Sequence, residues 1–360
     1  MNKLEIGDRR IGEGHPTYFI ADISANHDGD LERARTLIHL AAEAGANAAK
    51  FQNFRASWIV SEKGFSDLGG QLSHQSKWKK SVFQVYKEAS LPWEWTPVLR
   101  DECAHAGIHY LSTPYDLDAV DMLEPYVPAF KIGSGDINWL EMLDKVASKE
   151  KVVILATGAS ALGEVQQAVL HLLGLNPKLV VMQCNTNYTA SMENFRHIHL
   201  NVLRAYRTLF PAVILGLSDH TPGHATVLGA VALGARVVEK HFSDDTNREG
   251  PDHLFSMDPR TWREMVMRTR ELEMALGDPN KRVADNERET AIVQRRCLRA
   301  SRDVRKGTVL TRDLIDILRP APEGSIPPDQ LERVLCTKPE VDVKQGECFQ
   351  WSMLRQKERG

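Results

Sequence analysis

Short apolar runs alternate with longer stretches of helical periodicity along the first 276 residues of the chain. Eight of these runs read as buried parallel strands, because each is mostly apolar and is bounded by polar or turn-forming residues. They are YFIADI from Tyr18, AAKFQ from Ala48, HYLSTP from His109, AFKIGS from Ala129, VVILATG from Val152, LVVMQCN from Leu179, VILGLSDH from Val213 and RVVEKHF from Arg236. The stretch LERARTLIHLAAEAGA has helical spacing, with Ala34, Leu37, Ile38 and Ala41 on one face and Gly45 as its stop.

Eight strands with eight helical crossovers in about 260 residues match a (β/α)₈ barrel in number and length. A doubly wound open sheet is the competing arrangement. No GxGxxG follows the first strand, so a dinucleotide-binding fold is not indicated. The region 64–90 is longer than a plain connection, and we expect it to form an active-site loop and a helix over the barrel mouth. The predicted fold class is therefore α/β, a TIM barrel.

The pattern changes after Gly277. Residues 279–296 are polar and charged, which suits a linker, and short apolar runs with turn signals follow from Cys297. Turns that contain lysine and glycine recur at Lys306–Gly307 and, spaced one residue wider, at Lys344–Gly346. We therefore predict three parts: a barrel domain of residues 1–278, a linker of residues 279–296 and a small β-rich domain of residues 297–360.

Composition and charge narrow the class of protein. The 360 residues are 42% hydrophobic and 26% charged, and the formal net charge of −3 argues against a nucleic-acid-binding surface, which usually carries a basic excess. The five cysteines are scattered without CxxC spacing, which fits reduced thiols in a cytoplasm. Neither a signal-peptide core nor an 18-residue apolar run appears. We expect a soluble cytoplasmic protein without nucleic-acid or membrane partners.

Two histidines, His220 and His241, end the last two predicted strands. The carboxyl ends of the strands carry the active site in this barrel, and neighbouring parallel strands lie about 5 Å apart. Two imidazoles at adjacent strand ends can therefore reach one metal ion; two histidines on surface loops are the alternative. With few other strong ligands nearby, water or substrate would complete the shell of a divalent ion, which acts as a Lewis acid on a carbonyl.

Two lysines, Lys50 and Lys131, lie in otherwise apolar strands, where an unpaired ammonium is costly. Pairing with a structural carboxylate is one explanation, and the Schiff-base lysine of a pyruvate aldolase is another. A third is a cage for phosphate and carboxylate groups. The hydroxyl-bearing residues expected around the two cations are Thr113, Ser134, Thr157 and Ser218. They favour an anionic substrate, and a phosphate cage with a Lewis acid suggests addition of an anionic phosphate donor to an aldehyde.

With these residues in place, the chain resembles the sialic acid synthase family, whose members make nonulosonic acids from phosphoenolpyruvate and an N-acylated amino sugar. The matching stretches are FIADISANHDGDLERA, AGANAAKFQNF, LSTPYDLDAVDML, PAFKIGSGDINW, GLSDHTPG, VVEKHF and REGPDHLFSMDP. The tail ASRDVRKGTVLTRDLIDILRP resembles the C-terminal antifreeze-like (SAF) domain of that family. The match covers nearly the whole chain in the right order.

The resemblance implies a reaction and a metal. A divalent ion held by His220 and His241, Mn²⁺ or else Mg²⁺ or Co²⁺, would polarise the aldehyde of an open-chain sugar such as N-acetylmannosamine or a diacetamido-trideoxyhexose. C3 of phosphoenolpyruvate would attack that carbon, water would add at C2, and phosphate would leave by C–O cleavage. Asp22 is the third residue implied in catalysis.

The resemblance also assigns binding residues by position. Those implied for phosphoenolpyruvate are Lys50, Thr113, Lys131, Ser134 and Ser218. Those implied for the sugar are Gln52, Asp136, Tyr188, Asp252 and Arg319. Arg319 matches the arginine that the C-terminal domain inserts into the partner subunit's site, which implies a domain-swapped homodimer.

Several positions depart from the family pattern. Asp22 and Asp136 stand where glutamate is common, and Ala156 replaces a frequent serine. We therefore expect the phosphoenolpyruvate half of the site to be largely intact and the sugar half to be altered. Two other functions stay open: a pyruvate aldolase with Lys50 or Lys131 as its Schiff base, and a non-catalytic carbohydrate-binding protein.

Overall fold

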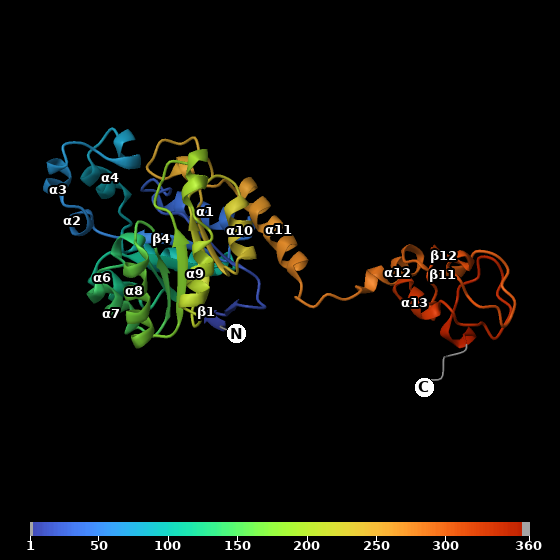
Figure 1. Cartoon of the computed structure of the whole chain (residues 1–360). Coiled ribbons are helices and arrows are strands. Elements are labelled where there is room, and N and C mark those ends of the chain that lie inside the picture. Colours follow the sequence, from blue (N-terminus) through green and yellow to red (C-terminus); the bar gives the residue numbers. More distant parts are fainter. Residues whose placement is uncertain (1–2, 355–360) are drawn as a thin grey trace. The chain divides into compact units, whose positions relative to one another are not determined.

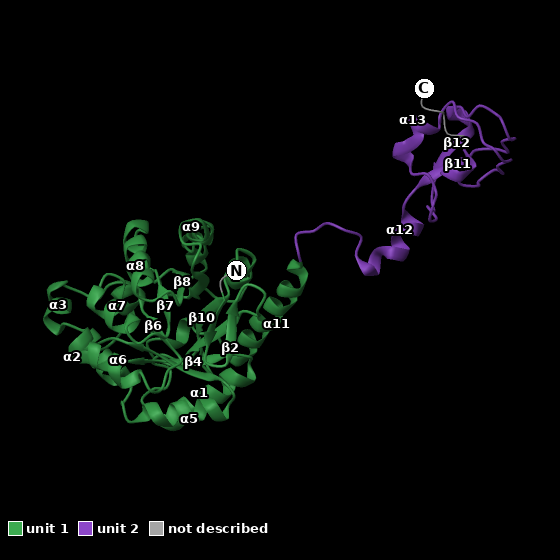
Figure 2. Ribbon diagram, turned by 90° about the horizontal axis from the view of Figure 1, so that it is seen from below, with its two compact units in different colours: residues 1–277 green, residues 278–360 purple. Residues whose placement is uncertain are grey.

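The computed structural model describes residues 3–354, and the chain divides into two compact units, residues 1–277 and residues 278–360 (Figures 1 and 2). The last residues of the expected β-rich domain, 355–360, lie outside the described residues. No helix within residues 3–354 is long and apolar enough to cross a membrane.

Eight parallel strands close into a barrel in the first unit, in the order β10-β3-β4-β5-β6-β7-β8-β9. Their bounds are β3 Tyr18–Asp22, β4 Ala48–Asn53, β5 His109–Pro114, β6 Ala129–Ile132, β7 Val152–Ala156, β8 Leu179–Cys184, β9 Ile214–Asp219 and β10 Val237–His241. Each lies within or along one of the eight predicted apolar runs, so the predicted TIM barrel is confirmed. Nearly every strand residue is buried, because helices cover the outer face and side chains fill the inner one.

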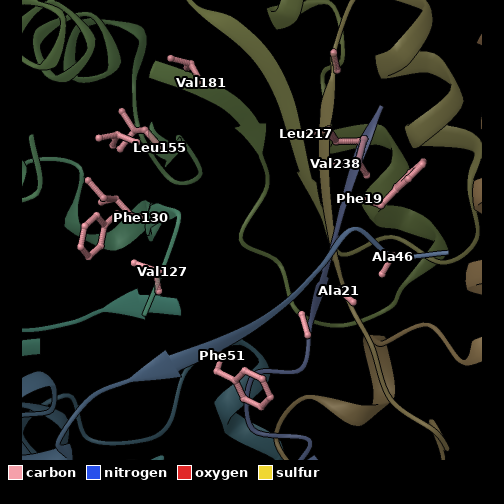
Figure 3. Packing of buried hydrophobic residues seen from close by; sticks show 14 of the residues in the cluster. Phe19, Ala21, Ala46, Phe51, Val127, Phe130, Leu155, Val181, Leu217 and Val238 are labelled. Carbon is pink, nitrogen blue, oxygen red and sulfur yellow. The ribbon is translucent and has the colours of Figure 1, made fainter. Parts of the chain in front are cut away.

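Helices cover the outside of the barrel (Figure 1). Their bounds are α1 Leu31–Glu43, α5 Trp95–His105, α6 Leu117–Leu123, α7 Leu140–Ala147, α8 Leu162–Leu175, α9 Val202–Leu209, α10 Ala225–Ala232 and α11 Pro259–Leu276. The buried residues of α1 are Ala34, Leu37, Ile38 and Ala41, as its periodicity predicts. Figure 3 shows part of the apolar layer between strands and helices, in which Phe19, Phe51 and Phe130 are fully buried.

An antiparallel hairpin, β1 Lys3–Ile6 and β2 Arg9–Gly12, precedes the barrel, and the sequence analysis missed it. Ile6 and Ile11 are fully buried among the side chains that fill the barrel interior near the strand starts, such as Val152 and Val237. The hairpin therefore closes the N-terminal end of the barrel. Its turn needs glycine at position 7, where φ is +58° and a Cβ would lie 2.6 Å from Nε2 of His109.

The long insertion after β4 forms four short helical segments rather than the single helix that we expected. They are α2 Ala56–Ile59, α3 Glu62–Asp67, the 3₁₀ turn η1 Ser73–Lys77 and α4 Val82–Ala89. Side chains of η1 and α4 line the cavity at the strand ends, which confirms the expected position over the barrel mouth. Other 3₁₀ turns of the first unit are η2 Ser134–Asp136, η3 Met192–His197 and η4 His253–Phe255.

The second unit is a small domain around an antiparallel pair, β11 Cys297–Ala300 and β12 Ile315–Leu318. Its other elements are η5 Asp285–Glu287, α12 Arg288–Gln294, η6 Arg312–Leu314, η7 Pro328–Gln330, α13 Leu331–Val334 and η8 Trp351–Met353. Leu298, Leu310 and Phe349 are fully buried in its own hydrophobic core.

Two Asp-Val-x-x-Gly turns, residues 303–307 and 342–346, pair with each other in this domain. The backbones of Val304 and Val343 exchange two hydrogen bonds of 2.8 Å. Asp342 accepts from the backbone N–H of Lys306 at 2.7 Å, and Asp303 accepts from the backbone N–H of Gln345 at 2.9 Å. The repeats therefore align on their Asp-Val pairs without the one-residue offset that the lysines suggested.

Candidate active site

A cavity of about 910 Å³, counted with its space open to solvent, lies at the carboxyl ends of the barrel strands. Eleven of the predicted site residues line it: Asp22, Lys50, Gln52, Thr113, Lys131, Ser134, Tyr188, Ser218, His220, His241 and Asp252. Asp136 is half-buried in η2 and is not part of the lining. Arg319 follows β12 in the second unit, where its side chain is exposed.

Strand register explains which of these side chains meet. Asp22 of β3 pairs in register with His241 of β10 on one side and with Lys50 of β4 on the other. Ser218 of β9 pairs in the same way with Glu239 of β10. In-register residues of adjacent strands point to the same face of a sheet. Within each of these groups, the side chains therefore face the barrel interior side by side.

The same alternation places the side chain of Lys240 outside the site. On β10 the side chains of Glu239 and His241 face the cavity, and the side chain between them points outward. Lys240 forms a buried ion pair with Asp219, the outward-facing neighbour of Ser218. This pair belongs to the layer between barrel and helices and does not touch the cavity.

The two histidines lie side by side, with ring centroids 5.4 Å apart. His220 Nδ1 lies 2.8 Å from the backbone carbonyl of Asn185, so Nδ1 carries the hydrogen and Nε2 keeps a free lone pair. Burial, together with the charge of His241, lowers the pKa of His220 to about 3. The ring is therefore neutral near pH 7, which is the form that binds metal.

The residues present fit a divalent ion whose shell the protein fills only in part. Within residues 3–354, no three His, Cys, Asp or Glu side chains form a ready metal-binding group. Nδ1 of His241 and Oδ1 of Asp22 are buried without a hydrogen-bond partner, and Nε2 of His241 lies 3.5 Å from Oδ2 of Asp22. Two imidazoles and a nearby carboxylate would leave the remaining positions for water or substrate.

Both cavity lysines pair with carboxylates that also face the cavity. Lys50 Nζ lies 2.8 Å from Asp22 Oδ2, and Lys131 Nζ lies 3.1 Å from Glu239 Oε1. All four side chains are at most 6% exposed. In this structure, each of the two buried lysines is thus paired with a carboxylate, which is the first of the explanations considered. The hydroxyl of Thr113 lies 3.5 Å from Lys50 Nζ, and that of Ser218 lies 3.2 Å from Glu239.

Glu239 is a site residue that sequence reasoning missed. It accepts a hydrogen bond from Ser218 Oγ at 3.2 Å, and its second oxygen, Oε2, is buried without a partner. Burial alone would raise its pKa, but the ammonium groups of Lys131 and Lys50 outweigh burial and lower the pKa to about 2. Its same-face position, two residues before His241, was the available signal.

Thr157 was wrongly placed in the phosphate cage. Its hydroxyl lies 2.9 Å from the carbonyl of Met182 and 3.0 Å from the hydroxyl of Tyr206 on α9, so it points away from the cavity. Ala156 lines the cavity instead, as does Cys184, another residue that was not anticipated. The backbone N–H of Gly158 donates to Ser134 Oγ at 2.9 Å and fixes that hydroxyl.

Aromatic side chains form the wall of the cavity beside the histidines. Tyr188 stacks edge-on against His220 with ring centroids 4.2 Å apart, and His74 and Phe255 lie 5.0 and 5.3 Å from Tyr188. Asp252 is held at this wall because it accepts from Ser24 Oγ at 2.6 Å. In η2, burial raises the pKa of Asp136 to about 6. The aromatic residues of the insertion were not predicted individually.

A closed eight-stranded barrel with paired lysines, hydroxyls and two adjacent histidines at its carboxyl face defines an enzyme for an anionic substrate, with room for a Lewis-acid metal. The model of the NeuB family matches residues 37–281, and the model of the SAF domain matches residues 295–355. The chain belongs to the NeuB family, which confirms the resemblance to sialic acid synthases.

Named relatives and solved structures agree with this assignment. The N,N'-diacetyllegionaminic acid synthase of Campylobacter jejuni is 35% identical over 85% of this chain and 91% of its own. The N-acetylneuraminate-9-phosphate synthase of Homo sapiens is 31% identical over 94% of this chain and 93% of its own. The crystal structure of the N-acetylneuraminic acid synthetase of Leptospira borgpetersenii matches with a TM-score of 0.70 at 26% identity, over 80% of this chain and 95% of that chain.

Proposed function

We propose that this protein condenses phosphoenolpyruvate with an N-acylated amino-sugar aldehyde to form a nonulosonic acid, with C–O cleavage and release of phosphate. One observation carries the proposal: two buried lysines lie beside hydroxyls in a cavity that also holds two adjacent histidines. The names of the relatives, which include legionaminic acid, neuraminate-9-phosphate and pseudaminic acid synthases, support it.

Phosphoenolpyruvate binds at the lysines. Its phosphate and carboxylate replace the carboxylates of Asp22 and Glu239 as partners of Lys50 and Lys131, and so keep both ammonium groups paired. The hydroxyls of Thr113, Ser134 and Ser218 donate the remaining hydrogen bonds. Ser134 is oriented for this because its oxygen already accepts from the backbone of Gly158, which leaves its hydrogen for the substrate.

The sugar aldehyde lies at the histidines. Synthases of this family generally depend on a metal, and here His220 and His241 would hold a divalent ion, with Mn²⁺ as our choice over Mg²⁺ or Co²⁺. Bound there, such an ion polarises the aldehyde carbonyl. Tyr188 and Asp252 line the same side of the cavity, and Gln52 and Asp136 complete the proposed sugar-binding set.

Carboxylates of this chain are the proposed proton acceptors. A new bond forms between C3 of phosphoenolpyruvate and the aldehyde carbon, whose oxygen takes up one proton. Water then adds to the cationic C2 and gives up one proton. The C–O bond to phosphate breaks next, and the remaining hydroxyl proton passes to the departing phosphate, which leaves a carbonyl at C2. Oδ1 of Asp22 and Oε2 of Glu239 are carboxylate oxygens of the cavity that are buried without partners, so they can take the water's proton.

A Schiff-base aldolase fits these contacts less well. Burial lowers the pKa of Lys50, but the carboxylates of Asp22 and Glu239 outweigh it and raise the pKa above its ordinary value. A lysine that forms a Schiff base needs the opposite shift, because the neutral amine is the nucleophile.

The first experiment measures phosphate release from phosphoenolpyruvate by the metal-replete protein with N-acetylmannosamine, its 6-phosphate and diacetamido-trideoxyhexoses. We expect turnover with a sugar that is lost on chelation and in His220→Ala. With ¹⁸O in the bridging oxygen of phosphoenolpyruvate, C–O cleavage sends the label into phosphate. Borohydride trapping of pyruvate on the protein, or label retained in the sugar product, would refute the proposal.

We also propose a domain-swapped homodimer in which Arg319 of one subunit completes the site of the other. The test co-expresses Arg319→Ala with His220→Ala, each inactive alone. Random pairing makes half of the dimers mixed, and each mixed dimer carries one intact site, so about a quarter of wild-type activity returns. Activity that stays at the level of the separate variants contradicts the swap.

A further inference from the structure

The inner cavity opens into an outer vestibule of about 1530 Å³, counted with its space open to solvent. The two share wall residues, including His74, Trp78, Val85, Tyr188 and Pro251, so they are continuous. A sugar whose aldehyde lies at the histidines must extend its distal carbons toward this vestibule. The chemistry of the vestibule wall therefore selects among sugars that differ at the distal end.

Most of the charged side chains that line the vestibule are already paired. Its cationic lining residues are Lys77, Lys79 and Lys80, and its acidic lining residues are Asp28, Glu88 and Glu249. Lys79 lies 2.5 Å from Glu249, and Lys80 lies 2.7 Å from Glu88. Lys77 is the one lysine of this described lining without a carboxylate partner, and its side chain is exposed at the rim.

The rest of the wall is apolar and aromatic. His74 lies between Trp78 and Tyr188, with ring centroids 5.5 and 5.0 Å away, and Tyr188 contacts Phe255 at 5.3 Å. Val85, Ala89, Pro251 and Leu254 complete the surface. Aromatic faces and aliphatic groups bind methyl groups and C–H faces, but they offer a phosphate dianion neither positive charge nor hydrogen-bond donors.

We propose that the sugar substrate is uncharged and carries apolar substituents at its distal end, as a diacetamido-trideoxyhexose does, and is not a hexose 6-phosphate. This inference rests on the proposed function. A phosphate dianion requires cations that no carboxylate already neutralises. A deoxy methyl and a second acyl methyl each gain about fourfold in affinity when buried on such a wall, and together about sixteenfold.

The test ranks kcat/KM of the full-length holoenzyme for a diacetamido-trideoxyhexose, N-acetylmannosamine and N-acetylmannosamine 6-phosphate. We expect kcat/KM for the diacetamido sugar to exceed that for N-acetylmannosamine by about sixteenfold and kcat/KM for the 6-phosphate to be lowest. Preference for the 6-phosphate, or equal use of the two uncharged sugars, overturns the inference.

Two variants show whether the vestibule sets the ranking. Trp78→Ala should raise KM for the diacetamido sugar more than KM for N-acetylmannosamine, whereas Trp58→Ala, which removes a half-exposed tryptophan stacked on Arg55, should change neither. Glu249→Gln frees Lys79 and should lower the KM ratio of the 6-phosphate to the uncharged sugar. The assignment is overturned if Trp78→Ala leaves the KM ratio of the two uncharged sugars unchanged and Glu249→Gln leaves the KM ratio of the 6-phosphate to the uncharged sugar unchanged.

Failure of the inference is distinguishable from failure of the proposed function. Calorimetric titration of the same three sugars into the metal-loaded protein ranks their binding without turnover. If no sugar releases phosphate from phosphoenolpyruvate but the diacetamido sugar binds best, the proposed reaction falls and the vestibule assignment stands. If phosphate is released and the 6-phosphate binds best, the proposed reaction stands and the vestibule assignment falls.

Discussion

Replacing Glu239 by glutamine removes one buried negative charge and keeps the shape of the side chain. The carboxylate is at most 6% exposed, and Lys131 with Lys50 lowers its pKa to about 2 against an ordinary value of 4.5. At 1.36 kcal/mol for each pKa unit, the ionised group stabilises the fold by about 3 kcal/mol. Glu239→Gln should therefore lower the free energy of unfolding by about that amount at pH 7, because Lys131 is left without its partner.

Because the pKa of Glu239 is lowered in the folded protein, the loss of unfolding free energy in Glu239→Gln depends on pH. A carboxylate whose folded pKa is depressed stabilises the fold above its unfolded pKa, and that stabilisation disappears as pH falls from about 4.5 to about 2. The stability gap between wild type and Glu239→Gln should therefore narrow over this range. Denaturant unfolding at several pH values measures it.

A phosphate titration makes the test specific to the lysine pair. With one counter-charge gone, inorganic phosphate should raise the melting temperature of Glu239→Gln more than that of wild type, and KM for phosphoenolpyruvate should fall along with kcat. The matched control is Glu193→Gln, because the ion pair of Glu193 with Arg196 is 60% and 78% exposed, lies outside the lining of both the cavity and the vestibule, and contributes little to stability. Wild-type stability in Glu239→Gln, or equal response to phosphate, would refute the assigned role of this carboxylate.

Three further outcomes are expected. Burial raises the pKa of Asp136 to about 6, so wild type should lose unfolding free energy as pH rises from about 4 to about 6. KM for the sugar should change near pH 6, and Asp136→Asn should flatten both pH profiles. Asp28 accepts from His253 at 3.0 Å and from Arg248 at 2.9 Å, so Asp28→Asn should cost about 2 kcal/mol and raise KM for the sugar but not for phosphoenolpyruvate. Chelation should abolish turnover with little change in circular dichroism, and Mn²⁺ should restore it; full activity of protein shown to be metal-free by mass spectrometry contradicts the metal proposal.

The barrel was predictable because its strands are buried on both faces, so each appears in the sequence as an uninterrupted apolar run. The N-terminal hairpin escaped prediction because its strands are only four residues long and just Ile6 and Ile11 are fully buried. The insertion over the mouth was located but not resolved into helices, since residues 56–89 have few buried side chains to set a period.

The site was predictable in its residue types but not in all of its contacts. Alternation along a strand would have included Glu239 and excluded Lys240, and register explains why Asp22 meets both Lys50 and His241. Other features depend on tertiary structure alone. The ion pair of Lys131 with Glu239 joins β6 and β10, which are not neighbours in the barrel, so no local pattern reports it.

The hairpin at the foot of the barrel has a consequence for kinetics. With that end filled by Ile6 and Ile11, ligands exchange through the mouth, and Lys131 and Glu239 line the inner cavity but not the vestibule above it. Phosphoenolpyruvate must then enter before the sugar, and phosphate must leave after the nonulosonic acid. Steady-state rates will follow a compulsory order, in which excess sugar competes with phosphoenolpyruvate and phosphate is the last product to leave.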